Sequence, residues 1–469
     1  MTSDASEFGS QPSADVSPQV LRRAVVASAI GNATEWFDYG VYAYVAAEIG
    51  HAFFPGEHET LGALLGFAVS FVLRPLGGIV WGPLGDRLGR TAVLTATILL
   101  MCSSTFLVGL IPSYQSIGIW APVLLILLRI IQGFSTGGEY GGAATFMAEF
   151  APNDKRGFWG SFLEFGTIAG FTVALLLVSG LRYLVDADAM AEWGWRIPFL
   201  IAGPLGGIGV YMRLKLEDTP VFRDLEDGGH VHRDTSSHFK HLFGMHWRPV
   251  LQLFGLVLAL NVANYTLLAY MPTYLSHTVG MDRHHSEMLL LIGQLFMMAL
   301  MPLAGSLSDR IGRKTCWWIS LSGLFVLAAP MFMLMTHSLV LAVVGFTVLG
   351  AVYVLQLGTI SATFPAMFPA HVRYAGMAIS YNLATAVFGG TAPAANDLLI
   401  DLTGNALMPA FYMMGACAIG MIALYPVVET RGASLHGIYT PGTARAARAH
   451  REAAARSLGD AAAIPDGRG

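Results

Sequence analysis

Long apolar segments separated by shorter polar ones recur along almost the whole chain. A helix needs about 20 mostly apolar residues to cross the hydrocarbon core of a bilayer. Twelve windows along the chain meet this requirement. They lie at residues 23–48, 60–83, 91–111, 118–145, 157–180, 196–215, 248–276, 285–308, 315–336, 339–365, 373–399 and 406–427. The pattern therefore predicts an all-α membrane protein with twelve transmembrane helices.

A longer polar stretch separates the first six windows from the last six, so we expect two six-helix halves joined by a loop. The expected organisation is an N-terminal tail at 1–19, halves at 20–215 and 248–428, a central loop at 216–247 and a C-terminal tail at 429–469. The histidines of the central loop match no common metal-site spacing, which favours a hydrated linker. The apolar positions of the C-terminal tail are nearly all Ala, which argues against a dimeric coiled coil.

The distribution of Lys and Arg predicts the orientation of the chain in the membrane. If the N-terminus is cytoplasmic, all but five of the 27 basic residues fall on the cytoplasmic side. The exceptions are Arg182, Arg196 and Arg283 outside the membrane, and Arg74 and Arg129 within predicted spans. By the positive-inside rule, both termini are then cytoplasmic. The N-terminal tail has no basic segment before a short apolar core, so we expect it to be a tail rather than a cleaved signal.

Composition excludes several classes of protein. Of the 469 residues, 54% are hydrophobic and only 12% are charged, about half the share that is usual in soluble proteins. This excludes a cytosolic enzyme, a disordered scaffold and a nucleic-acid-binding protein, which would need a basic field. Three widely separated cysteines match neither a disulfide framework nor a zinc site. The sequence has no H-E-x-x-H, G-x-S-x-G or phosphate-binding loop, so we expect neither an enzyme nor a bound metal.

Two short motifs occur once in each half of the chain. Residues 82–90 are GPLGDRLGR and residues 305–313 are GSLSDRIGR, each after the second span of its half. Residues 152–156 and 369–373 correspond in the same way after the fourth span. We therefore interpret the chain as a duplicated six-helix unit. Such repeats place the substrate between the halves and work by alternating access.

The repeated loops are candidates for a charge latch between cytoplasmic helix ends, because an Asp in such a loop contributes little to topology. The alternative is that their basic residues serve only to set the topology. The candidate gating residues are Gly82, Asp86, Arg87, Gly89, Arg90, Arg156, Gly305, Asp309, Arg310, Gly312, Arg313 and Arg373.

The motif G-x-x-x-D-R-x-G-R, present twice, resembles the signature of the major facilitator superfamily. Runs that resemble its metabolite:proton symporter branch are GNATEWFDYGVY (31–42), RPLGG (74–78), RIIQGFSTGGEYGGA (129–143) and WGWRIPF (193–199). Runs that resemble the proline/betaine transporters of this branch are IPSYQSIGIWAPVLL (111–125), YMPTYLSH (270–277) and FPAMFPAHVRYAG (364–376). The resemblance implies the major facilitator fold, with two pseudo-symmetric six-helix halves. It also implies uptake of a compatible solute such as proline or glycine betaine through the bacterial inner membrane, driven by the proton gradient without a cofactor.

Ionisable side chains inside the predicted spans are candidate functional groups, because a charge at the bilayer centre costs at least about 2.5–3.5 kcal/mol. Glu35 and Asp38 in the first span lie at a depth similar to that of Arg129 in the fourth. The resemblance associates Arg129 and Gln132 with proton transfer. We expect Arg129 to pair alternately with a carboxylate of the first span and with the substrate, so that protonation of Glu35 or Asp38 frees it. The alternative is that Asn32 and Glu35 only form hydrogen bonds between helices.

Three further ionisable residues lie within predicted spans. Glu139 in the fourth span and Glu164 in the fifth are candidates for proton coupling, with helix packing as an equal alternative. Arg74 in the second span needs an anionic partner that the sequence does not identify.

A zwitterionic osmolyte needs donors for its carboxylate and aromatic faces for its cationic group. The substrate-binding candidates are Asn32, Trp36, Tyr39, Arg129, Gln132, Asn261, Asn264, Tyr265, Gln356, Tyr381 and Asn382. The alternative substrate is an organic acid of the 2-oxoglutarate, citrate or shikimate type, which should recruit more cations than Arg129 alone. A membrane receptor without transport is the alternative from another class. The expected partners are the substrate, protons and membrane lipid, without nucleic acid, and the oligomeric state stays open.

Overall fold

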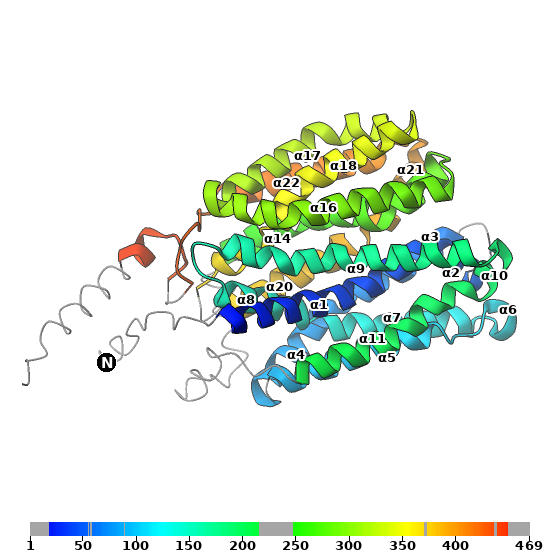
Figure 1. Cartoon of the computed structure of the whole chain (residues 1–469), viewed down its shortest axis with the longest axis horizontal. Helices are drawn as coiled ribbons and strands as arrows, with labels where there is room; N and C mark the ends of the chain where they lie inside the picture. The colour runs from blue at the N-terminus through cyan, green and yellow to red at the C-terminus, as the bar shows by residue number, and fades with distance from the viewer. Residues whose placement is uncertain are drawn as a thin grey trace, which may run out of the picture.

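The computed structural model describes residues 18–54, 56, 59–88, 90–214, 247–369, 373–435 and 439–448. Within these residues the chain is almost entirely helical, as the apolar windows predict. The long helices lie side by side in one elongated bundle (Figure 1). The start of α1 and the C-terminal segment drawn in red lie at one end of this bundle, and α2, α6 and α10 lie at the other (Figure 1).

Each of the first six predicted windows coincides with one helix or with two consecutive helices. They are α1 (Pro18–Tyr44) with α2 (Ala46–Phe53), α3 (Glu59–Val72) with α4 (Arg74–Leu88), α5 (Arg90–Val108), α7 (Trp120–Thr136) with α8 (Glu139–Phe150), α9 (Arg156–Leu184) and α11 (Ile197–Leu214). Short helices α6 (Tyr114–Ile117), α10 (Ala187–Glu192) and η1 (Gly194–Arg196) lie in the connections.

The last six windows coincide with helices in the same way. They are α14 (Trp247–Asn264) with η2 (Tyr265–Tyr270), α15 (Met271–Thr273) and η3 (Tyr274–Thr278), α16 (Arg283–Ile311), α17 (Arg313–Met335), α18 (Leu339–Leu357) with α19 (Ile360–Thr363) and η4 (Pro365–Met367), α20 (Arg373–Ala384) with η6 (Thr385–Gly389) and α21 (Ala392–Thr403), and α22 (Met408–Leu424). The segments η2, η3 and η6 are π-helical, a geometry that is frequent at functional sites.

Several helical segments of the described chain are long and apolar enough to span a membrane. Seven meet both criteria among the described residues, some of them across the boundary between two consecutive helices, and other apolar helices are shorter. Large apolar side chains such as Leu303 and Ile422 are exposed on the outside of the bundle. Most of the predicted central loop, and much of both predicted tails, lie outside the described residues, so the domain boundaries stay predictions.

The two halves contact each other along pairs of helices. α9 packs along both α1 and α16, and α3 contacts η6 and α21. α4 packs against α20, and α1 contacts η2. The seam between the halves therefore lies among α1, α3, α4 and α9 on one side and α14–η2, α16, α20 and α21 on the other.

Candidate functional site

A small cavity lies at the seam between the halves. It is lined by Trp36, Glu164, Thr167, Leu260, Asn261, Asn264, Tyr353, Leu357, Ile360 and Tyr381. The first three belong to α1 and α9 of the first half, and the rest belong to α14, α18, α19 and α20 of the second. The sequence analysis selected five of these side chains, so the structure gathers about half of the cavity lining from predicted residues.

Three aromatic rings of the cavity are held by hydrogen bonds or stacking. The indole Nε1 of Trp36 donates to Asn32 Oδ1 at 3.1 Å. The hydroxyl of Tyr353 donates to Asn264 Oδ1 at 2.8 Å. Tyr381 stacks on Tyr140 with 4.3 Å between ring centroids. Aromatic faces held in this way suit a cationic group that offers few hydrogens for hydrogen bonding.

Glu164 carries the only formal charge among the ten residues that line this cavity. Its carboxylate accepts hydrogen bonds from the hydroxyl of Tyr140 and, at 2.9 Å, from Thr167 Oγ1. Thr167 Oγ1 in turn accepts from Asn32 Nδ2 at 2.7 Å. Hydroxyl donors therefore orient the carboxylate, and a cationic ligand in the cavity would meet it.

Buried polar atoms on the helices that line the cavity, or on the segment that directly follows α14, lack hydrogen-bond partners within the described part of the chain. They are Tyr265 Oη, both amide atoms of Gln356, and the hydroxyls of Ser361 and Ser380. The ring centroid of Tyr265 lies 6.0 Å from that of Trp36. Buried polar atoms need a water or ligand partner. These side chains are therefore candidates for contacts with the uncharged or anionic part of a ligand.

Arg74, whose partner the sequence did not identify, forms a buried ion pair with Glu35. Its Nε donates to Thr136 Oγ1 at 3.1 Å, and its guanidinium lies 5.1 Å from the ring centroid of Phe71. Trp36 follows Glu35 directly, so it lies about 100° further around the helix. This rotation separates the cavity-lining indole of Trp36 from the Glu35 carboxylate.

Arg129 lies against Asp38 and outside the cavity lining. The two side chains form an ion pair at 3.6 Å between Nη1 and Oδ2. Gln132 Nε2 donates to Oδ2 of Asp38 at 3.1 Å and to Thr105 Oγ1 at 2.6 Å. The guanidinium of Arg129 lies 3.7 Å from the ring centroid of Tyr42 and is fully buried. The pairing of Arg129 with the first span agrees with the expected geometry, whereas its contact with substrate stays a prediction.

Other candidates from the sequence have partners away from the cavity. Tyr39 Oη lies 3.3 Å from Thr136 Oγ1. Asn382 Nδ2 donates to the carbonyl oxygen of Gly137 at 2.8 Å and so joins α20 to the segment between α7 and α8. The side chain of Glu139 lies outside the described part of the structure. Tyr353 was missed, although it stands one turn before Gln356 on the same helix.

The repeated loop of the second half contacts the first half. Asp309 accepts hydrogen bonds from the backbone N–H groups of Gly157 and Phe158, both at 2.9 Å, at the N-terminus of α9. This placement is favourable because a helix N-terminus carries partial positive charge. A Cβ added to Gly305 would lie 2.4 Å from the carbonyl oxygen of Gly157, so the helices cross where both residues are glycine. Arg313 Nη2 also contacts Asp309, at 2.6 Å.

The remaining gating candidates are placed differently. Gly312 has a φ of +101° at the break between α16 and α17, which favours glycine. Arg310 is exposed. Gly82, Asp86, Arg87, Gly89 and Arg90 fall in a stretch whose side chains lie outside the described part of the chain.

Residues 430–435, which we call the C-terminal strap, contact both halves. Arg156 Nη1 donates to the carbonyl oxygen of Ala433 at 2.9 Å. Arg373 lies in the corresponding loop of the second half. Its Nη2 donates to the carbonyl oxygen of Leu435 at 2.6 Å. The buried Leu435 side chain forms a small cluster with Ala148 and Ala366, one from each half. The strap therefore joins the two halves at the same end of the bundle as Asp309.

A duplicated helix bundle with a central cavity between its halves, and contacts that close one end, is the architecture of a secondary transporter. A family model described as Major Facilitator Superfamily matches residues 29–395. The chain belongs to the Major Facilitator Superfamily. The fold class inferred from the sequence, twelve transmembrane helices in two six-helix halves, is thereby confirmed.

Relatives with named activities are transporters. The chain is 42% identical to the glycine betaine/proline/ectoine/pipecolic acid transporter OusA of Dickeya dadantii, over 89% of this chain and 85% of the relative. It is 43% identical to the proline/betaine transporter of Escherichia coli K12, with the same coverage of both chains. These relatives indicate a role in transport rather than in catalysis.

Solved structures share the fold at low sequence identity. One is the proton:xylose symporter XylE bound to 6-bromo-6-deoxy-D-glucose, with a TM-score of 0.71 and 17% identity over 89% of this chain and 98% of the other. Another is a partially occluded inward-open conformation of XylE from E. coli, with a TM-score of 0.67 and 18% identity over 89% of this chain and 100% of the other.

Proposed function

We propose that the chain takes up a small zwitterionic osmolyte, such as proline or glycine betaine, by proton symport and alternating access. The observation that carries this proposal is the charge pattern of the central cavity. It combines one carboxylate, Glu164, with the rings of Trp36, Tyr353 and Tyr381. A quaternary ammonium is attracted both by a carboxylate and by aromatic faces. The printed names of the relatives, which include glycine betaine and proline, support the same substrate class.

The carboxylate of the zwitterion needs hydrogen-bond donors. Gln356 Nε2 and the Tyr265 hydroxyl are buried and lack partners among the described residues. They are the candidate donors, because Gln356 shares α18 with two lining residues and the Tyr265 ring lies near that of Trp36. An organic acid is the second candidate class, but its carboxylates would lie close to Glu164 with no Lys or Arg among the residues that line the cavity. Like charges at such a distance repel each other. The charge pattern thus favours the zwitterion.

Proton coupling is assigned to the buried carboxylates. Glu35 and Asp38 each form an ion pair with an arginine. Protonation of either carboxylate would remove its attraction for the arginine and leave a buried cation free to rearrange. Glu164 is the third candidate, because it lies in the cavity itself. We further propose that the protein is a multi-pass protein of the bacterial inner membrane with both termini in the cytoplasm, as the positive-inside rule predicts.

Uptake into proteoliposomes tests this function. The purified chain is reconstituted, a proton gradient is imposed, and accumulation of labelled proline, glycine betaine and 2-oxoglutarate is measured in parallel. We expect proline or glycine betaine to accumulate and a protonophore to abolish the accumulation. Accumulation of 2-oxoglutarate alone would contradict the zwitterion assignment. Binding of a zwitterion without any uptake would instead favour a receptor.

A further inference from the structure

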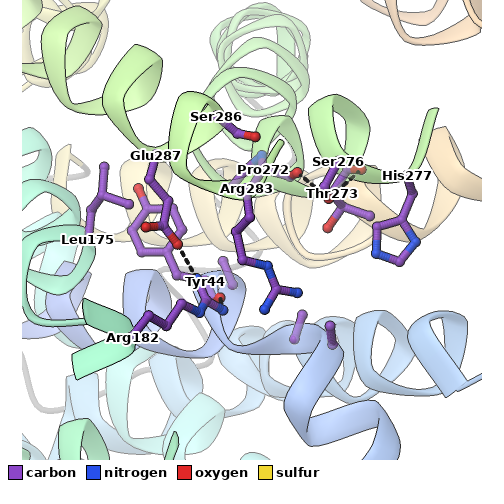
Figure 2. Close-up of a pocket in the computed structure, with 13 residues that line it drawn as sticks. Tyr44, Leu175, Arg182, Pro272, Thr273, Ser276, His277, Arg283, Ser286 and Glu287 are labelled. Carbon is purple, nitrogen blue, oxygen red and sulfur yellow. Dashed lines mark hydrogen bonds and ion pairs between the residues drawn. The ribbon is translucent and has the colours of Figure 1, made fainter. Parts of the chain in front are cut away.

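A second cavity, open to the outside, lies at the end of the bundle opposite to Asp309. Figure 2 shows the side chains that line it. It lies between the outer ends of α1, α2 and α9 from the first half and α15, η3 and α16 from the second. Arg182, Arg283 and Glu287 line it together with Ser276 and His277. The proposed orientation places this end outside the membrane, where a ligand arrives from the periplasm.

Four charged side chains form a network between the halves at this cavity. Arg182 Nη2 lies 2.8 Å from Glu48 Oε1, and Arg182 Nη1 contacts Glu287 of the second half (Figure 2). Arg283 of the second half lies 3.1 Å from the same oxygen of Glu48 in the first. The network contains two cations and two anions, so its formal charge is balanced. Two of its ion pairs connect the halves directly.

The network also fixes the break between α1 and α2. Arg182 Nη2 donates to the carbonyl oxygen of Tyr44, the last residue of α1, at 2.8 Å. The Tyr44 hydroxyl accepts from Gln294 Nε2 of α16 at 2.6 Å. Opening of this end of the bundle therefore requires the separation of Arg182 from Glu287, of Arg283 from Glu48 and of Gln294 from Tyr44.

The network leaves hydrogen-bonding capacity unused in the described structure. Glu48 Oε2 and Arg182 Nε are buried and have no hydrogen-bond partner among the described residues. The side chain of Arg283 is 50% exposed, whereas that of Glu287 is 12% exposed. Arg283 is thus accessible to an arriving carboxylate, and Glu287, which lines the cavity, lies nearby for an arriving cation.

We propose that this second cavity is an outer binding site for the transported zwitterion, an inference that rests on the proposed function. The ligand's carboxylate pairs with Arg283 and its cationic group with Glu287, both of which line the cavity. A zwitterion thus replaces the partner of each of these two side chains at once, and Arg182 and Glu48 stay paired with each other. A singly charged ion leaves one buried charge without a partner, which is strongly unfavourable. Occupancy by the zwitterion therefore weakens the contacts between the halves and favours opening toward the central cavity.

Protection of a cysteine in this cavity tests the proposal. Cys102, Cys316 and Cys417, all buried, are replaced by Ala, and Ser276→Cys adds one thiol at the lining of the outer cavity. Labelling by a membrane-impermeant maleimide is measured in proteoliposomes with glycine betaine, acetate or tetramethylammonium at equal concentration. We expect glycine betaine to slow labelling several-fold and the two single ions to leave its rate unchanged. Equal protection by acetate or tetramethylammonium would overturn the proposal.

A variant of the central cavity separates the two sites. With Trp36→Leu added, we expect glycine betaine to protect Ser276→Cys at the same half-saturating concentration, because the outer site is intact. With Glu287→Gln added, protection should disappear. The matched control Glu192→Gln, at an exposed position, should retain it. Loss of protection in the Trp36→Leu variant would assign the effect to the central cavity and overturn the outer site.

Equilibrium dialysis provides a second readout that needs no cysteine. We expect two molecules of glycine betaine per chain for the wild type and one for Glu287→Gln, whereas one molecule for both would overturn the proposal. Uptake by the wild type is measured in the same preparation. Failure of uptake contradicts the proposed function. Normal uptake without protection or a second bound molecule contradicts only the outer site.

Discussion

Buried carboxylates in this protein differ in the groups that surround them. Glu164 is held by the hydroxyls of Tyr140 and Thr167 and faces the cavity. Glu35 and Asp38 each lie against a buried arginine outside the cavity lining. The first environment leaves the negative charge available to a ligand, and the other two compensate it within the protein. We therefore expect substitutions of these residues to have different consequences.

Glu164→Gln should weaken recognition of the cationic group while preserving the shape of the cavity. A hydrogen bond or contact with a charged group contributes about 1.5–3 kcal/mol, and each 1.4 kcal/mol is a factor of ten. We expect KM for glycine betaine uptake to rise about tenfold or more. The control Glu192→Gln removes an exposed carboxylate and should leave KM unchanged. An unchanged KM in Glu164→Gln would remove this residue from the substrate site.

Glu35→Gln and Asp38→Asn should uncouple accumulation from the proton gradient while sparing exchange of substrate between the two sides. Each change also leaves a buried arginine without its counter-ion, which costs about 3–5 kcal/mol. We expect a lower thermal unfolding temperature for Glu35→Gln and partial recovery when Arg74→Gln is added. Counterflow and gradient-driven uptake are measured side by side. Concentrative uptake at the wild-type level in both single variants would contradict the coupling role.

Sequence reasoning located many of the side chains of the site but only some of their partners. Glu164 was identified because ionisable residues are unusual inside membrane spans. Trp36, Asn261, Asn264 and Tyr381 were identified because a zwitterion needs hydrogen-bond donors and aromatic faces. Arg129 was expected to pair with a carboxylate of the first span, but the choice between Glu35 and Asp38 and the partner of Arg74 were not predictable. Depth along a helix does not determine the direction in which a side chain points. A rotation of 100° per residue places Glu35 against Arg74 and its neighbour Trp36 in the cavity.

Helices of the two halves approach each other closely where α9 crosses α16. Gly157 and Gly305 permit this contact, since a side chain on either would meet the backbone of the other helix. Apolar periodicity predicted both helices but carries no information about crossing points. It also did not reveal the break at Val45 between α1 and α2, which no Pro or Gly marks. The break between α3 and α4 is easier to rationalise, because Pro75 lacks the N–H that would continue the helix.

Gly305→Ala should disfavour closure at the end of the bundle where Asp309 lies. The added Cβ would lie 2.4 Å from the Gly157 carbonyl oxygen, so the helices must separate. We expect a shift toward the conformation open at this end, measured as faster labelling of a cysteine placed at Ser361, a buried residue that lies against Gly160 of α9. Gly415→Ala is the matched control, because a Cβ there meets no atom within 4 Å. Equal labelling rates in both variants would contradict a role of this contact in closure.

Contacts of different chemistry close the two ends of the molecule. Ion pairs join the halves around Arg182 at one end. At the other end, backbone carbonyl oxygens of the strap accept hydrogen bonds from Arg156 and Arg373, and Leu435 packs between the halves. The strap is the part of the fold that the sequence analysis missed most completely. Residues 430–435 follow the last span, and neither their composition nor their spacing indicates a contact with distant loops.

Leu435→Asp should release the strap, because a carboxylate would replace the apolar side chain of a residue that is only 4% exposed. Burial of an unpaired charge is strongly unfavourable. We expect the distance between spin labels on the two halves at this end to shift toward longer values, measured by pulsed electron paramagnetic resonance. Val428→Asp is the control, since Val428 is exposed. An unchanged distance distribution in Leu435→Asp would show that the strap does not hold the halves together.

The position of Trp36 has a practical consequence for the study of ligand binding. Its indole lines the central cavity with its N–H bonded to Asn32. A ligand cation above the ring would replace water or empty space beside the fluorophore and alter its emission. The chain contains nine tryptophans, so the difference in fluorescence between the wild type and Trp36→Phe isolates the contribution of this one. The protein thus contains an intrinsic optical reporter of its own central cavity, with which affinity can be titrated without a radioactive substrate.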